Sequence, residues 1–156
     1  MSNEVGNLAL FSDTPRVVAL KAQWSELLAR LMEAIANRDL PLWGLHLARL
    51  QRVSWRTLAA QQEDLDEIAR KKGLPVEAGV RLPAAQDLVA HLAALAEVKT
   101  DVALSRDDAE AIGDGDALAR LDGYDVEIAT LEAETRADLG LVVAAEKGGR
   151  QWVFVN

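Results

Sequence analysis

Hydrophobic positions recur every three or four residues over most of the chain, which is the period of an amphipathic α-helix. In the first such segment they line one face for about five turns. They are Val17, Leu20, Trp24, Leu27, Leu28, Leu31 and Ile35. Pro15 suits a first helical turn, where its missing N–H costs nothing. The pattern therefore predicts a helix over about 15–37 after an N-terminal arm at 1–14.

A second, longer helix is predicted over about 41–72, with Pro41 in its first turn and Gly73 as its stop. Its apolar residues also share one face. They are Trp43, Leu47, Leu50, Leu58, Leu65 and Ile68. Because only a short break separates the two helices, we expect them to pack as one antiparallel helical hairpin over 15–72.

The stretch GLPVEAGVRLP (73–83) holds two glycines and two prolines, so it reads as a linker. The alternation of Val76, Ala78 and Val80 with more polar neighbours is compatible with a short strand inside it. Beyond the linker the pattern predicts a second helical pair over 84–137, with helices at about 84–104 and 117–137. Ser105 followed by Asp108 resembles the capping box of a short helix that GDGD interrupts.

The last segment, LGLVVAAEKGGRQWVFVN, has two apolar runs on either side of Lys147-Gly148-Gly149. Alternation in both runs predicts a C-terminal β-hairpin over 138–156. A lone two-stranded hairpin is marginal in water, so it must dock on its own helices, pair with 76–82, or join another chain's sheet. In a further alternative, 139–146 continues the fourth helix. The expected fold is mainly α: an antiparallel helical bundle of about four helices with this hairpin.

Two groups of side chains are candidates for contact with a partner. The first is apolar and belongs to the predicted hairpin: Leu141, Val143, Trp152, Val153 and Phe154. The second lies opposite the apolar face of the second helix: Arg49, Arg52 and Arg56, flanked by Trp55. These arginines would suit an acidic protein or a nucleic acid. In the alternative they form a solvated face with ion pairs, including pairs to the acidic half of the same chain.

The formal net charge of −8 is unevenly distributed. Residues 97–138 hold thirteen acids and four bases, whereas the rest of the chain is nearly balanced with twelve acids and thirteen bases. Such a segment repels phosphates, so nucleic acid is an unlikely partner for it. A second hypothesis follows, in which the protein is an inhibitor or regulator that presents 97–138 to a basic partner.

Residue types needed for common catalytic sites are scarce. The absence of cysteine excludes disulfides, thiolate metal sites and a cysteine nucleophile. The two histidines, His46 and His91, belong to no zinc-binding motif, and GDGD does not fit a calcium-binding loop. Glu63 and Asp66 form one E-x-x-D pair, but no second pair follows, which disfavours the alternative of a carboxylate-rich metal-dependent hydrolase. We therefore expect no enzyme activity, no cofactor and no bound metal.

The sequence thus favours a non-catalytic structural or adaptor subunit that mediates protein–protein contacts in a larger assembly, for example a virion. Its partners would be other protein subunits, as a homo-oligomer or as part of a larger complex. No apolar run reaches 18 residues, and the N-terminal MSNEVGNLALF lacks the basic region of a secretory signal. We expect no membrane partner and a location in the cytoplasm, or in an assembly formed there.

Overall fold

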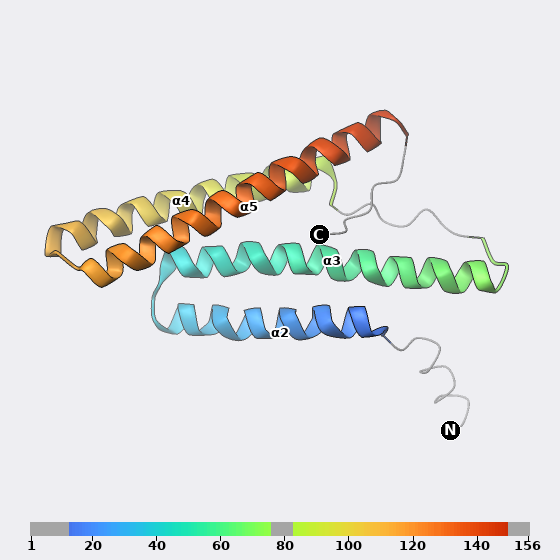
Figure 1. Cartoon of the computed structure of the whole chain (residues 1–156), viewed down its shortest axis with the longest axis horizontal. Helices are drawn as coiled ribbons and strands as arrows, with labels where there is room; N and C mark the ends of the chain where they lie inside the picture. The colour runs from blue at the N-terminus through green and yellow to red at the C-terminus, as the bar shows by residue number, and fades with distance from the viewer. Residues whose placement is uncertain (1–12, 76–82, 150–156) are drawn as a thin grey trace, which may run out of the picture.

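Four α-helices form the structure, a computed structural model that describes residues 13–75 and 83–149 (Figure 1). They are α2 (Pro15–Ala36), α3 (Leu40–Lys71), α4 (Ala85–Ile112) and α5 (Gly115–Lys147). No strand occurs within these two ranges. The predicted helical bundle of about four helices is therefore confirmed, but α4 and α5 extend beyond the predicted ranges of 84–104 and 117–137.

The predicted C-terminal β-hairpin is wrong. α5 runs to Lys147 without a break, so the segment expected to be the first strand is helical. Leu139, Val142 and Ala145 recur every three residues and so share one face of a helix, with Val142 packed against Trp55 and Leu88. Leu141 is exposed and Val143 half-buried. The expected second strand, with Trp152, Val153 and Phe154, lies outside the described residues.

The helix boundaries at the acidic break also differ from the expectation. Ser105 lies inside α4, which continues to Ile112, so no separate short helix starts there. GDGD is the true break, because Gly113 ends α4 with a left-handed φ of 68° that glycine adopts without strain. Asp114 then caps α5 by accepting a hydrogen bond from the backbone N–H of Ala117 at 3.1 Å. The strand considered within 76–82 falls in the undescribed gap.

α3 is the central helix of the bundle (Figure 1). α2 packs against α3 alone among the described helices, while α4 pairs closely with α5 and also packs on α3. The largest core cluster joins α3, α4 and α5. It consists of Leu45, Val98, Val102, Ala109, Ala117, Leu121, Tyr124 and Ile128. A separate cluster of Leu27, Leu31, Leu50 and Val53 joins α2 to α3. The two helical hairpins therefore meet through α3. The surface of α3 that α2, α4 and α5 leave uncovered is described below.

Close packing of α3 on α4 depends on Gly44. A Cβ added at this position would lie 2.6 Å from Cγ2 of Val98, a buried and rotationally stiff side chain. Overpacking of this kind costs about 1–3 kcal/mol, whereas alanine gains up to ~1 kcal/mol of helix propensity over glycine. We expect Gly44→Ala to lower the free energy of unfolding by about 1 kcal/mol in urea denaturation followed by circular dichroism.

Gly123→Ala in α5 is the matched control, because a Cβ there meets no atom within 4 Å. Its free energy of unfolding should rise by about 0.5–1 kcal/mol from helix propensity alone. Equal responses of the two variants would show that α3 and α4 are not in close contact at Gly44.

Candidate functional site

Arg52 lies in the interior of the protein, although the sequence placed it on the polar face of its helix. Its side chain is 2% exposed. Its Nη2 donates to Oδ2 of Asp138 at 2.9 Å, and its Nη1 donates to the Thr135 hydroxyl at 3.2 Å. Glu134 adds a carboxylate oxygen at 3.6 Å. Burial of a guanidinium is costly unless it is paired and hydrogen-bonded, and α5 supplies both kinds of partner.

A second arginine one turn earlier makes a similar connection nearer the surface. Arg49 donates to a carboxylate oxygen of Glu127 in α5, and its Nη1 lies 3.3 Å from Nδ1 of His46. Burial lowers the pKa of His46, and the positive charges of Arg49 and Arg30 lower it further. Of the two alternatives for the arginines, the structure shows ion pairs to the acidic half of the chain for Arg49 and Arg52. Contact with another macromolecule stays a prediction.

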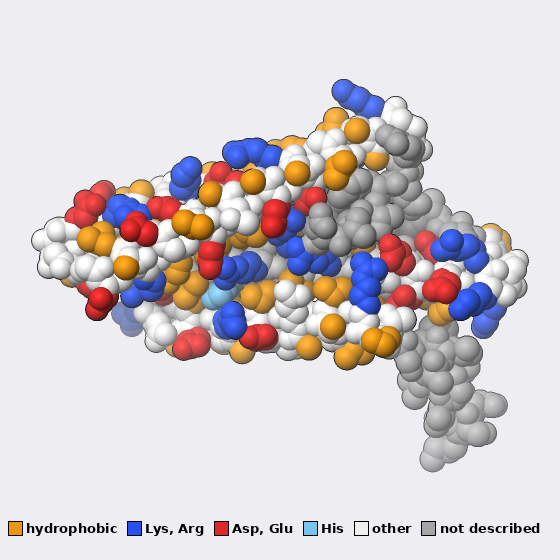
Figure 2. Space-filling view, viewed as in Figure 1, with side chains coloured by type: hydrophobic (Ala, Val, Ile, Leu, Met, Phe, Trp, Pro, Cys, Tyr) orange, Lys and Arg blue, Asp and Glu red, His pale blue; other side chains and the backbone are white. Residues whose placement is uncertain are grey.

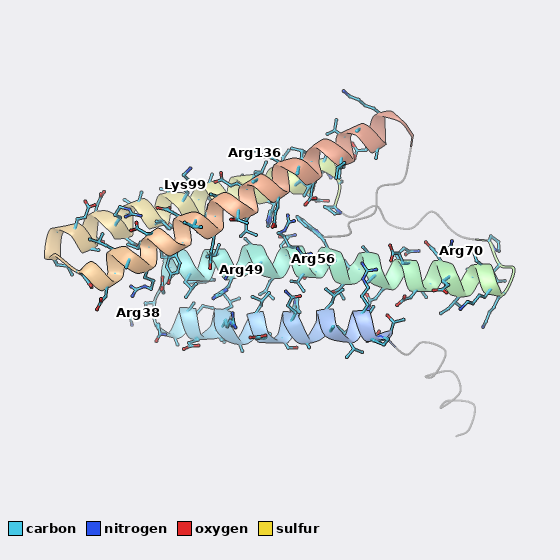
Figure 3. The ribbon with its side chains drawn as sticks, viewed as in Figure 1. Arg38, Arg49, Arg56, Arg70, Lys99 and Arg136 are labelled. Atoms are coloured by element: carbon cyan, nitrogen blue, oxygen red, sulfur yellow. The ribbon has the colours of Figure 1, made fainter. Side chains whose placement is uncertain are left out.

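Arg56 differs from both. No carboxylate lies within 4 Å of it among the residues described, and its Nε is buried with no hydrogen-bond partner there. Burial lowers the pKa of Arg56, and the charge of Arg52 one turn away lowers it further. Glu134 and Asp138 act in the opposite direction, because their carboxylates attract this cation without forming a direct ion pair with it. Figure 3 labels Arg49 and Arg56 along α3.

These side chains line a cleft of about 350 Å³ between α2, α3 and α5, here called the arginine cleft. Its charged lining comprises four cations and two carboxylates: Arg30, Arg49, Arg52, Arg56, Glu127 and Glu134. Leu27, Val53 and Leu131 supply apolar surface. In Figure 2, Lys and Arg side chains gather along the middle of the molecule, between the α2–α3 hairpin and α5. Glu26 and Asp138 pair with Arg30 and Arg52, so the cleft combines a balanced set of charges with an apolar wall.

Trp55 does not join the arginines. It is 4% exposed and packs with Leu88 and Val142 in the core between α3, α4 and α5. Its ring meets that of His91 in α4, with centroids 5.2 Å apart and tilted by 59°. Burial, and then the charge of Arg52, lowers the pKa of His91 to about 4. Nε2 of His91 is buried without a hydrogen-bond partner in the described residues. This histidine is a neutral core residue at physiological pH.

Seven of the thirteen acids in the segment 97–138 form ion pairs or a helix cap within the described structure. Arg106 in α4 binds Asp122 at 2.6 Å and Asp125 at 2.7 Å in α5, which ties the two helices together. Other acids of the segment pair with Arg49 and Arg52, as described above. In the ranges 13–75 and 83–149, no group of three His, Asp or Glu side chains is placed to hold a metal ion. Binding of this segment to a basic partner stays a prediction.

Sequence reasoning found the apolar face of α3 but missed that most of this face is exposed. At 100° per residue, twelve residues of α3 fall within about 60° of the direction of Leu58, and none is charged. One of them, Trp55 at the edge, is buried, and Gly44 packs on Val98 of α4. Without Trp55 the set is Leu40, Trp43, Gly44, Leu47, Gln51, Ser54, Leu58, Gln61, Gln62, Leu65 and Ala69. We call this set the neutral face. Five of them are large apolar side chains that are 37–51% exposed: Leu40, Trp43, Leu47, Leu58 and Leu65.

Most residues of the apolar face predicted for this helix are therefore on the outside. Of Trp43, Leu47, Leu50, Leu58 and Leu65, only Leu50 is buried. The residues that pack on α2 instead include Leu50 and Val53, and those that pack on α4 and α5 include Leu45 and Trp55. A pocket of about 470 Å³ adjoins the neutral face, where Trp24 of α2 lies near Ser54 and Leu58 of α3. The signal that could have revealed this face is its lack of charge over about eight turns.

No protein-family model, no curated protein and no solved structure matches this chain. In the described part of the chain, no helix is long and apolar enough to span a membrane. Functional inference therefore rests on the neutral face of α3.

Proposed function

We propose that this protein is a non-catalytic assembly subunit that binds a second copy of itself through the neutral face. The observation that supports this proposal is the exposed, uncharged stripe of Leu40, Trp43, Leu47, Leu58 and Leu65. More than a quarter of all residues are charged, so an uncharged strip of this length is unusual for a surface. Depletion of charge at the centre, with aromatic residues present, is typical of protein interfaces.

A second copy fits this face better than a charged partner does. Each molecule carries a net charge of −8, so two copies repel unless they meet where charge is absent. An uncharged surface is complementary to itself, as a two-fold interface requires. The stripe from Leu40 to Leu65 is about 38 Å long. With a width of about 20 Å, or two helix spacings, it offers about 750 Å², close to the ~800 Å² that each partner of a standard interface buries.

Sedimentation velocity tests the proposal directly. The full chain should shift from its monomer mass of 16.9 kDa toward twice that mass as its concentration rises through the micromolar range. Leu47→Glu combined with Leu58→Glu places two carboxylates on each neutral face. Buried unpaired charges cost several kcal/mol, so the dissociation constant should rise at least ~100-fold. Both positions are about half exposed, so the variant should keep the circular dichroism spectrum and thermal midpoint of the parent.

Val126→Glu is the matched control, because Val126 is an exposed apolar residue of α5 outside the neutral face. It adds one carboxylate to each chain, half the added charge of the double variant, and should leave association unchanged. A parent chain that stays monomeric at every concentration would exclude self-association. Dimers that survive the Leu47/Leu58 double substitution would place the interface elsewhere.

The proposal extends to the setting of the protein. Incorporation into a larger assembly would follow if dimers expose further contact surfaces, and Leu141 in α5, which is exposed, is one candidate for such a contact. The absence of cysteine suits a cytoplasmic protein, or an assembly formed in the cytoplasm, because no oxidising compartment is needed. A non-catalytic role remains part of the proposal.

A further inference from the structure

We infer that the second copy binds antiparallel, with its α3 lying along the neutral face in one register. This inference rests on the proposed self-association and adds how the two copies meet. The observation that carries it is a symmetry within the neutral face. Large apolar residues, each about half exposed, lie at equal distances on either side of a point midway between residues 52 and 53. They are Leu40 and Leu65 at the outer positions, and Leu47 and Leu58 at the inner positions.

This symmetry is the one that an antiparallel two-fold interface requires. When two antiparallel helices are related by a two-fold axis, residues at equal distances on either side of that axis lie opposite each other. Leu47 of one copy then lies opposite Leu58 of the second copy, and the two outer leucines meet in the same way. At the centre, Gln51 lies opposite Ser54. Apolar side chains therefore meet apolar ones, and polar side chains meet polar ones.

The distribution of charge along the bundle favours the antiparallel over the parallel direction. α3 ends in a basic stretch, with three bases and no acid in 68–75. The turn between α4 and α5, at the opposite end of the bundle, has five acids and no base in 107–116 (Figure 1). Antiparallel copies bring each basic end to the acidic end of the other copy, whereas parallel copies place like charges together.

The pocket beside the neutral face gives this register an anchor. Its volume is about 470 Å³, and its lining includes Trp24 of α2 and Leu58 of α3. Leu47 of the second copy lies opposite Leu58, so its side chain can enter the pocket. On a helical projection, Leu47 and the pocket residue Ser54 lie on the same side of the direction of Leu58 as Leu50, which packs on α2. The two-fold axis repeats this contact, and side chains that fill such pockets carry much of the binding energy of an interface.

Exchange of charge between positions 47 and 58 tests the register in the full chain. Leu47→Glu and Leu58→Lys should each raise the dissociation constant at least ~10-fold, because each places an unpaired charge in the interface. In an equimolar mixture of the two variants, the introduced carboxylate and ammonium face each other at one contact, and the native leucines face each other at the other. The heterodimer should therefore bind at least ~10-fold more tightly than either homodimer. Native mass spectrometry, with one variant isotope-labelled, measures the heterodimer.

Leu47→Glu mixed with Leu47→Lys is the matched control. In the antiparallel register the two copies of position 47 are eleven residues apart along α3, or ~16 Å. This mixture should gain less than ~3-fold over its homodimers. Recovery in this mixture instead of the first would indicate parallel helices and overturn the inference. A parent that dimerises while neither mixture recovers would overturn the register alone, whereas a monomeric parent would exclude both the register and the self-association.

A double-mutant cycle tests the pocket contact. Trp24→Ala and Leu47→Ala should each raise the dissociation constant at least ~10-fold, and the combined variant should raise it by less than the product of the two. Within one copy Leu47 is three turns of α3 away from Leu58, so such coupling must arise between copies. Val126→Ala should associate like the parent. Independent effects of the two substitutions would show that Leu47 does not enter the pocket and would overturn the inference. Trp24→Phe supplies the same cycle should circular dichroism show that Trp24→Ala is not folded.

Discussion

Replacement of Arg52 with methionine is expected to lower the free energy of unfolding by about 3–5 kcal/mol, the usual cost of breaking a buried ion pair from one side. Methionine fills much of the same space, so the main loss is electrostatic. Asp138, itself 3% exposed, would keep its charge in the interior without the donor at 2.9 Å. Urea denaturation followed by circular dichroism at pH 7 measures the change.

Arg56→Met is the matched control, on the same helix and one turn away. Arg56 makes no ion pair within 4 Å in the described structure, and burial lowers its pKa. Its removal should change the free energy of unfolding by less than ~1 kcal/mol, because a half-buried charge without a direct ion pair is removed. Arg52→Met combined with Asp138→Leu should recover most of the loss. Equal effects of Arg52→Met and Arg56→Met would contradict the pairing of Arg52 with α5.

The second large effect concerns pH. The folded protein holds the pKa of His91 at about 4, below its ordinary value of 6.5, because burial and the nearby Arg52 disfavour the imidazolium. The unfolded chain therefore binds a proton that the folded chain does not as the pH falls from about 6.5 to about 4. Stability contributed by neutral His91 is present above pH 6.5 and is lost across this window. One pKa unit corresponds to ~1.4 kcal/mol, so the loss approaches ~3 kcal/mol at pH 4.

His91→Gln removes this titration, so its free energy of unfolding should fall less steeply than that of the parent between pH 6.5 and 4. A shallower decrease should remain, because the pKa of His46 is also lowered and acts in the same direction. NMR of the imidazole nitrogens gives an independent measurement: His91 should remain neutral at pH 5.5. A ring that titrates near pH 6.5 would show that His91 is not buried against Trp55.

The order and number of the helices were readable from the sequence because helical periodicity is a local property. Two apolar residues three or four apart share a face whatever the rest of the chain does. Gly113 and Asp114 mark the break between α4 and α5 for equally local reasons: a left-handed backbone and a capping carboxylate. The same local reasoning failed after Leu139, where alternation at every second residue coexists with a helical repeat through Leu139, Val142 and Ala145.

The role of each face of a helix was not readable in this way. The long apolar face of α3 looked like its core, yet Leu47, Leu58 and Leu65 remain exposed, and Trp55 at the edge of that face is buried. A helix at the centre of a bundle contacts α2 and the α4–α5 hairpin from different directions, so its buried residues are spread around it. No single hydrophobic stripe can describe such a helix.

By itself the sequence determined the four helices, most of their limits and the acidic character of residues 97–138. Only the tertiary structure decided which surfaces are open and which charges are internal. Arg49, Arg52 and Arg56 look equivalent on a helical projection. α5 brings Glu127 to Arg49 and Asp138 to Arg52, whereas Arg56 makes no direct ion pair in the described structure. These partners come from more than 70 residues away in the chain, and no local pattern encodes a contact of that separation.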